Sequence, residues 1–154
     1  HPQHRRQRQM CIRDSRSPLA EGILRQKTKE KNLNWTIDSA GTGSWHIGES
    51  PDNRSIKVGK KYGIDISKQK ARQFQVSDFD EFDILFVMDA SNYRNVQRMA
   101  RNESDKAKIK LILNECYPQQ NRAVPDPYWN DDGFELVYQL LHDACEAFVQ
   151  KYSS

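Results

Sequence analysis

Residues 84–88 read Ile-Leu-Phe-Val-Met, and this unbroken apolar run constrains the fold more than any other stretch of the chain. A strand with one face in water alternates apolar and polar residues, whereas a continuous run is typical of a parallel strand that is covered on both faces. We therefore predict a buried parallel strand over residues 83–88, in a sheet that carries helices on both faces.

Helical and strand-like segments alternate along the rest of the chain. Strands are expected over residues 35–38 and 108–113, and helices over residues 18–29, 50–62, 91–101 and 132–152. Gly63 is a plausible residue to end the second helix, and Asp132-Gly133-Phe134-Glu135 resembles a capping box that opens the last helix. This alternation predicts an α/β fold, a three-layer sandwich around a parallel sheet, formed as one domain by residues 16–154. Ligands bind to such folds at the carboxyl ends of the strands, so we expect the site at that edge.

The first 15 residues differ in composition from the remainder. Residues 1–16 hold five arginines and one acidic residue, whereas the rest of the chain carries 19 basic and 20 acidic residues. Residues 1–9 contain no core-forming side chain, which predicts disorder. We therefore expect residues 1–15 to be a disordered or foreign basic tail, and a nucleic-acid-binding function would depend on that tail alone.

Cysteine usage and hydropathy narrow the setting. Three scattered cysteines fit neither a disulfide framework nor a zinc site. No stretch approaches the roughly 20 apolar residues that span a membrane. We expect a monomeric chain in a reducing, cytoplasmic setting, with no membrane or nucleic-acid partner.

Residues 16–22, Arg-Ser-Pro-Leu-Ala-Glu-Gly, contain the start of the first helix. Ser17 is a favourable N-cap and Pro18 a favourable first helical residue. A helix N-terminus beside the guanidinium of Arg16 is a ready anion site, although an ordinary capped helix explains the same residues.

Asp126 lies between two prolines and is followed by Tyr128 and Trp129. A stiff loop of this kind can present a general acid beside an aromatic-walled pocket. The alternative is a turn in which Asp126 caps the backbone locally and the two rings pack.

Two other segments could reach the same edge of the sheet. Residues 39–48 form a glycine-rich loop in which Trp45 is either a pocket wall or a core plug, and His46 is more typical of a surface histidine than of a catalyst. Asp89 and Asn92 follow the buried strand, where they could cap the next helix or touch the site.

Together these segments resemble the low-molecular-weight protein tyrosine phosphatase family. The stretches that carry the resemblance are Arg-Ser-Pro-Leu-Ala-Glu-Gly (16–22), Asp-Ser-Ala-Gly-Thr-Gly-Ser-Trp-His (38–46), Ala-Arg-Gln (71–73), Phe-Asp-Ile-Leu-Phe-Val-Met-Asp (82–89) with Asn92, and Asp-Pro-Tyr (126–128). The resemblance implies a four-stranded parallel sheet of order 2-1-3-4 and the hydrolysis of phosphotyrosine proteins or small aryl phosphates, without metal or cofactor. It also implies a phosphocysteine intermediate on a Cys-x5-Arg loop.

The resemblance assigns the roles residue by residue. Arg16 would clamp the phosphate, and Asp126 would protonate the leaving phenolate and then activate water. The residues implied in substrate binding are Ser17, Trp45, Tyr128 and Trp129, and those implied in supporting the loop are Ser39, Asp89 and Asn92.

The residues before Arg16 depart from the family pattern. The family's nucleophilic cysteine stands six residues before the arginine, and this chain has Met10 there, whose thioether cannot form a thiolate. Cys11 is one residue too close to Arg16, and Ile12 replaces a glycine that takes positive φ readily. The histidine that backs the family's loop is Gln69 here. The residues before Arg16 are polar and basic, which also predicts that the first and central strand is missing or aberrant.

Several interpretations remain open. Residues 1–15 could be foreign sequence joined to a genuine family body, which would leave the chain inactive as written. Alternatively, the chain could be a natural relative that binds phosphate or phosphotyrosine without turnover. An arsenate reductase of the same fold needs additional redox cysteines, and Cys116 and Cys145 are far apart in the sequence.

Overall fold

The computed structural model describes residues 8–13, 16–41, 48–129 and 132–153. Its sheet has four parallel strands in the spatial order β2-β1-β3-β4, as the resemblance implies. The strands are β1 (Arg8–Arg13), β2 (Thr36–Gly41), β3 (Ile84–Val87) and β4 (Ile109–Leu111).

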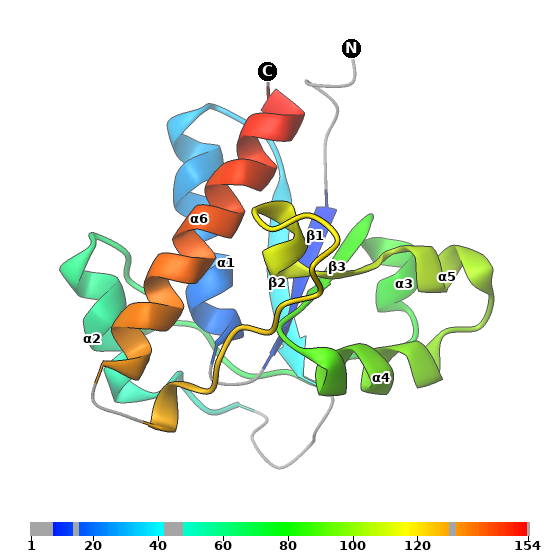
Figure 1. Ribbon diagram of the computed structural model, residues 1–154, viewed down its shortest axis with the longest axis horizontal. Helices are drawn as coiled ribbons and strands as arrows, with labels where there is room; N and C mark the ends of the chain where they lie inside the picture. The colour runs from blue at the N-terminus through cyan, green and yellow to red at the C-terminus, as the bar shows by residue number, and fades with distance from the viewer. Residues whose placement is uncertain (1–7, 14–15, 42–47, 130–131, 154) are drawn as a thin grey trace.

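Helices cover both faces of the sheet (Figure 1). The α-helices are α1 (Ser17–Glu30), α2 (Asn53–Lys61), α3 (Asp78–Glu81), α4 (Ala90–Met99), α5 (Glu103–Ala107) and α6 (Gly133–Ser153), and the short 3-10 helices are η2 (Ile112–Glu115) and η3 (Pro127–Trp129). In the view of Figure 1, α1, α2 and α6 lie on one side of the strands, and α3, α4 and α5 lie on the other. This is the expected three-layer arrangement.

The side chains of β3 explain why its sequence is continuously apolar. Ile84 and Phe86 belong to the core that α1 and α6 cover, whereas Leu85 and Val87 belong to the core on the face of α3 and α4. All four are at most 6% exposed. Burying each of them stabilises the fold by about 2 kcal/mol relative to leaving it in water.

The predicted absence of the first strand is wrong. β1 occupies the centre of the sheet and pairs with β2 from Arg8↔Thr36 to Arg13↔Gly41, and with β3 from Gln9↔Ile84 to Cys11↔Phe86. Ladder hydrogen bonds use main-chain groups, which every residue but proline supplies, so a polar composition does not by itself prevent a strand.

The same strand corrects the expected extent of disorder. Arg8 and Gln9 lie within β1, whereas residues 1–7 and 14–15 are outside the described residues. Whether residues 1–15 are foreign to the chain is a separate question from whether they pair.

Helix boundaries differ from the expectation by one to three residues, as cap geometry commonly decides. The N-cap of α1 is Arg16 rather than Ser17 and makes no side-chain capping hydrogen bond. The cap of α2 is Asp52, whose carboxylate accepts from the Arg54 amide. Gly63 follows α2 with φ +82°, as predicted for a residue that ends a helix.

The carboxylate of Glu135, expected in a capping box, accepts hydrogen bonds from the Tyr62 hydroxyl and the Lys61 ammonium at the end of α2. These contacts fasten the start of α6 to the end of α2.

Candidate active site

Arg16 lies at the carboxyl edge of the sheet, and its side chain joins three segments. Its Nη2 donates to Asp89 Oδ2 over 2.7 Å, and its Nη1 donates to the carbonyl of Val124. Arg16 as a residue is 8% exposed. The start of α1, the end of β3 and the loop that follows η2 therefore meet at one guanidinium.

Asp89 performs both roles considered for it. It is the N-cap of α4, with Oδ1 accepting from the Asn92 amide over 2.8 Å, while Oδ2 pairs with Arg16. Burial raises the pKa of the Asp89 carboxyl, but the Asn92 amide and the Arg16 guanidinium outweigh burial and hold that pKa below its ordinary value. The carboxylate that faces Arg16 is therefore ionised at neutral pH.

Asn92 supports the same corner. Its Oδ1 accepts from the backbone N–H of Met88 over 3.4 Å, at the end of β3. Both polar residues after the buried strand thus fix the start of α4 relative to the sheet.

The loop that carries Asp126 is anchored beside Arg16. The N–H of Val124 donates to the carbonyl of Met88 over 2.9 Å, while the carbonyl of Val124 accepts from Arg16. Val124 is fully buried, and Asp126 follows two residues later with an exposed side chain. The fold therefore brings Arg16 and the Asp126 loop to the same edge of the sheet.

The predicted local turn at Asp126 is present. Its Oδ1 accepts from the Tyr128 amide over 2.9 Å, across a single turn of 3-10 helix. This turn does not exclude catalysis, because the carboxylate is exposed and has a second oxygen.

Tyr128 is held against the start of α2. Its ring is 49% exposed, and its hydroxyl donates to Asp52 Oδ2 over 3.2 Å. The guanidinium of Arg54 lies over the same ring, 4.7 Å from its centroid. Trp129, another predicted wall residue, has its main chain in η3. Trp45 and its neighbour His46 lie outside the described residues.

Ser39 and Ser17 are both buried. Ser39 Oγ donates to Glu21 Oε1 over 2.7 Å, and Glu21 Oε2 accepts from Arg25 Nε over 2.9 Å. Ser39 therefore fastens β2 to α1, behind the first turn of that helix.

Gln69 also contacts the first turn of α1. Its Nε2 donates to the Pro18 carbonyl over 3.1 Å, and its Oε1 is buried without a hydrogen-bond partner among the described residues. Gln69 therefore fastens the segment between α2 and α3 to the first turn of α1.

Cys11 lies within a strand rather than in a loop. Its main chain pairs with Ser39 on one side and Phe86 on the other, and β1 continues to Arg13. Only two residues separate the strand from Arg16, which makes this connection shorter than a Cys-x5-Arg loop.

The sequence did not identify Asp52, Arg54 or Val124 as part of this site. The segment Asp-Asn-Arg at 52–54 carries an N-cap signal only, and Val124 reads as an ordinary apolar residue. Their roles come from contacts across long sequence separations, for example 108 residues between Arg16 and Val124.

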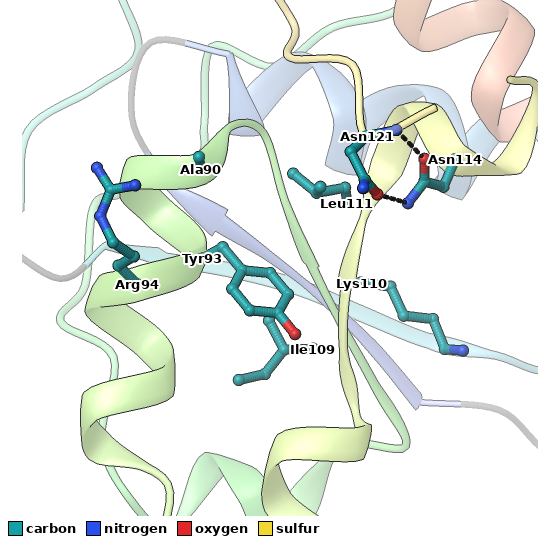
Figure 2. Close-up of a pocket in the computed structure, with 8 residues that line it drawn as sticks. All are labelled: Ala90, Tyr93, Arg94, Ile109, Lys110, Leu111, Asn114 and Asn121. Carbon is teal, nitrogen blue, oxygen red and sulfur yellow. Dashed lines mark hydrogen bonds between the residues drawn. The ribbon is translucent and has the colours of Figure 1, made fainter. Parts of the chain in front are cut away.

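A separate cavity of about 530 Å³ lies between α4 and β4 (Figure 2). Tyr93 points into it from α4 toward Ile109, and Asn114 and Asn121 pair with each other at its rim. Ala90, the residue after Asp89, borders it, but neither Arg16 nor Asp126 lines it. The cavity therefore neighbours the candidate site without containing its charged groups.

Among the described residues, no group of three or more His, Cys, Asp and Glu side chains is arranged to hold a metal ion. Among the helices of this part of the chain, none has the length and apolar character needed to cross a membrane.

Comparisons with known proteins identify the family of this chain. A family model described as low molecular weight phosphotyrosine protein phosphatase matches residues 9–153. A Schizosaccharomyces pombe protein of that description is 40% identical over 139 residues, which cover 88% of each chain.

Solved structures of phosphatases share the fold of this chain. A protein tyrosine phosphatase from Entamoeba histolytica superposes with a TM-score of 0.84 at 35% identity, covering 95% of each chain. A Drosophila arginine phosphatase also gives a TM-score of 0.84, at 33% identity, covering 96% of this chain and 97% of its own. The fold therefore accompanies more than one kind of phosphorylated substrate.

Proposed function

The chain belongs to the low-molecular-weight phosphotyrosine protein phosphatase family, and from this premise we propose how its residues divide the hydrolysis of a phosphotyrosine monoester. By homology it is a protein tyrosine phosphatase. Arg16 binds the phosphoryl oxygens, and Asp126 transfers protons. The observation that carries this division is Val124, which ties the Asp126 loop both to Arg16 and to the end of β3.

Two displacements at phosphorus make up the reaction. A cysteine thiolate attacks phosphorus, a P–S bond forms, the P–O bond to the aryl ring breaks, and Asp126 gives its proton to the leaving phenolate. Water then attacks the phosphocysteine, the Asp126 carboxylate takes the water proton, the P–S bond breaks, and inorganic phosphate leaves. Arg16 stabilises the charge on the equatorial oxygens in both steps.

The ion pair with Asp89 orients Arg16 for this role. A guanidinium has five N–H donors in a planar fork, and Asp89 and Val124 each accept one of them from a different terminal nitrogen. These contacts fix the plane of the guanidinium, which limits the rotational freedom lost when phosphate binds.

The nucleophile is where this chain departs from its relatives. We propose that the chain as written turns over slowly or not at all, because four residues rather than five separate Cys11 from Arg16 and the main chain of Cys11 is paired inside β1. A thiolate there is not presented by a loop whose amides surround phosphate. Residues 1–15 are, on this proposal, foreign to an otherwise intact phosphatase body.

The half-exposed Tyr128 supports an aryl substrate, since an aromatic residue next to Asp126 can pack against a phenyl ring. Arsenate reduction has less support. Burial raises the pKa of both the Cys116 and the Cys145 thiols, and thiol–disulfide exchange needs a thiolate. The second candidate is a relative that binds phosphotyrosine without turnover. Asp89 and Val124 hold the Arg16 side chain, and this does not require a nucleophilic cysteine.

The test compares two chains with 4-nitrophenyl phosphate, phosphotyrosine and phosphoarginine as substrates. One is the chain as written. The other, called the loop-restored chain, has residues 1–15 replaced by an apolar strand and a Cys-x-Gly-Asn-x-Cys loop that leads into Arg16. We expect hydrolysis of the two aryl substrates by the loop-restored chain, and Asp126→Ala should slow hydrolysis of phosphotyrosine far more than that of 4-nitrophenyl phosphate. Turnover by the chain as written that disappears with Cys11→Ser would overturn the proposed defect.

A further inference from the structure

An exposed cluster at the start of α2 has no part in the reaction steps above. Asp52 caps this helix, with Oδ1 accepting from the Arg54 amide over 2.8 Å. The guanidinium of Arg54 turns back to the same carboxylate, with Nε 3.1 Å from Oδ1 and Nη2 3.2 Å from Oδ2. Cap and guanidinium therefore form one rigid unit.

This unit contacts Tyr128 at two points, the ring and the hydroxyl. The guanidinium carbon of Arg54 lies 4.7 Å from the Tyr128 ring centroid, and the Tyr128 hydroxyl donates to Asp52 Oδ2. Phe134 closes the cluster, because its ring meets the edge of Tyr128 at 5.4 Å and lies 4.8 Å from the same guanidinium. Tyr128 is thus fixed to α2 and to the start of α6.

The position of Tyr128 determines the position of Asp126. The Tyr128 amide donates to Asp126 Oδ1, across a turn in which Pro127 fixes φ. The turn also sits tightly on α6, since a Cβ at Gly133 would lie 2.0 Å from the Pro127 carbonyl oxygen. Any displacement of the Tyr128 ring is therefore passed to the exposed carboxylate two residues before it.

We propose that Asp52 and Arg54 are positioning residues that hold the Asp126 loop in its reactive place through the ring of Tyr128. The inference rests on the proposed function in one respect, that Asp126 is the general acid. Neither Asp52 nor Arg54 needs to contact the substrate. In the sequence, Asp52 and Arg54 stand 76 and 74 residues before Tyr128.

The electrostatics of the cluster agree with a rigid unit. The Arg54 side chain, working against desolvation, holds the pKa of the Asp52 carboxyl below its ordinary value, and the Tyr128 hydroxyl contributes in the same direction. The carboxylate is therefore ionised at neutral and mildly acidic pH, where it can accept from both partners.

The first experiment measures amide hydrogen exchange by NMR in the chain as written, so it does not depend on turnover. We expect Arg54→Ala to speed exchange at the Tyr128 amide by about five- to tenfold, the factor that two exposed cation–π contacts supply. Amides of β3 should not change. The matched control is Arg98→Ala, which removes an exposed arginine of α4 that donates to Asn95 of the same helix. Unchanged exchange at Tyr128 would overturn the proposal.

The second experiment uses the loop-restored chain and a series of aryl phosphates. A poor leaving group needs the proton from Asp126, whereas 4-nitrophenolate hardly needs it. We expect Arg54→Ala to lower kcat for phenyl phosphate several-fold more than for 4-nitrophenyl phosphate, with Arg54→Lys recovering part of the loss. An equal loss for both substrates would indicate a merely structural role and contradict the inference.

The two failures can be told apart. If Asp126→Ala itself leaves the dependence on the leaving group unchanged, the proposed general acid is wrong. In that case the exchange measurement still decides whether Arg54 holds the loop. If Asp126→Ala steepens the dependence and Arg54→Ala does not, only the positioning role fails.

Discussion

The two charged groups of the site are held in contrasting ways. Arg16 is buried and held by partners 73 and 108 residues away, whereas Asp126 is exposed and held by an amide two residues away. A charge pair removed from water interacts strongly and tolerates little change, while an exposed turn is screened and can move. The phosphate-binding arginine is therefore fixed by long-range contacts, whereas the proton donor is fixed by a local turn at the surface.

The largest expected effect comes from removing the buried side of this comparison. Arg16→Ala leaves the Asp89 carboxylate partly buried without its guanidinium partner, so we expect a loss of about 2 to 3 kcal/mol in the free energy of unfolding. Urea denaturation at neutral pH measures it. The control is the double variant Arg16→Met with Asp89→Asn, which removes both charges and should recover part of the loss. A loss below about 0.5 kcal/mol for Arg16→Ala would show that the pair is effectively solvated.

The exposed side should give the opposite combination. Asp126→Asn keeps an oxygen that accepts from the Tyr128 amide, so stability should change by less than about 0.5 kcal/mol. In the loop-restored chain, kcat for phenyl phosphate should fall by about 10²-fold, because the proton donor is gone. Steady-state kinetics and urea denaturation on one preparation test both statements. A large loss of stability would mean that Asp126 is structural.

The pH dependence of stability should follow the titration of Asp89, the carboxylate that pairs with Arg16. The folded-state pKa of Asp89 lies below its ordinary value, so its contribution is present above the unfolded pKa of about 4 and is lost as pH falls through the folded pKa. We expect Asp89→Asn to remove about 1 kcal/mol at neutral pH and progressively less in acid. Denaturation curves at several pH values check this. A difference that stays constant with pH would point to lost packing instead.

The smallest effect is expected at the edge of the positioning cluster. Tyr128→Phe removes the hydroxyl that bonds Asp52 but keeps the ring beneath Arg54, so stability should fall by less than about 0.5 kcal/mol. The pKa of Asp52 should rise toward its ordinary value, since the hydroxyl contributes to lowering it. Carboxyl titration by NMR measures this shift. A larger effect on stability than that of Arg54→Ala would show that the hydroxyl, not the cation, holds the loop.

At β1 and at Glu135, contacts between distant segments go beyond what the local sequence pattern predicts. The polar composition of residues 8–13 suggested that no strand forms there, yet β1 pairs on both sides, because ladder bonds belong to the main chain and both neighbouring strands offer partners. Glu135 matched a capping-box pattern, and its carboxylate accepts hydrogen bonds from Tyr62 and Lys61 at the end of α2. In both cases the structure supplies partners that are distant in sequence.

The sequence by itself determined the features that depend on a few adjacent residues. The apolar run of β3 required cover on both faces, the glycine after α2 marked its end, and two prolines and an aspartate specified the turn at Asp126. Such features arise from backbone sterics and short-range hydrogen bonds, which adjacent residues fully define.

Only the tertiary structure decided which groups meet at the site. The pairing of Arg16 with Asp89, its bond to the Val124 carbonyl, and the stacking of Arg54 on Tyr128 join segments separated by 73 to 108 residues. Local sequence patterns do not predict these contacts, because the contacts depend on how the helices pack on the two faces of the sheet and where each strand ends. The physical reason is that side-chain partners are chosen by proximity in the folded core, which emerges from the whole chain rather than from any one stretch of it.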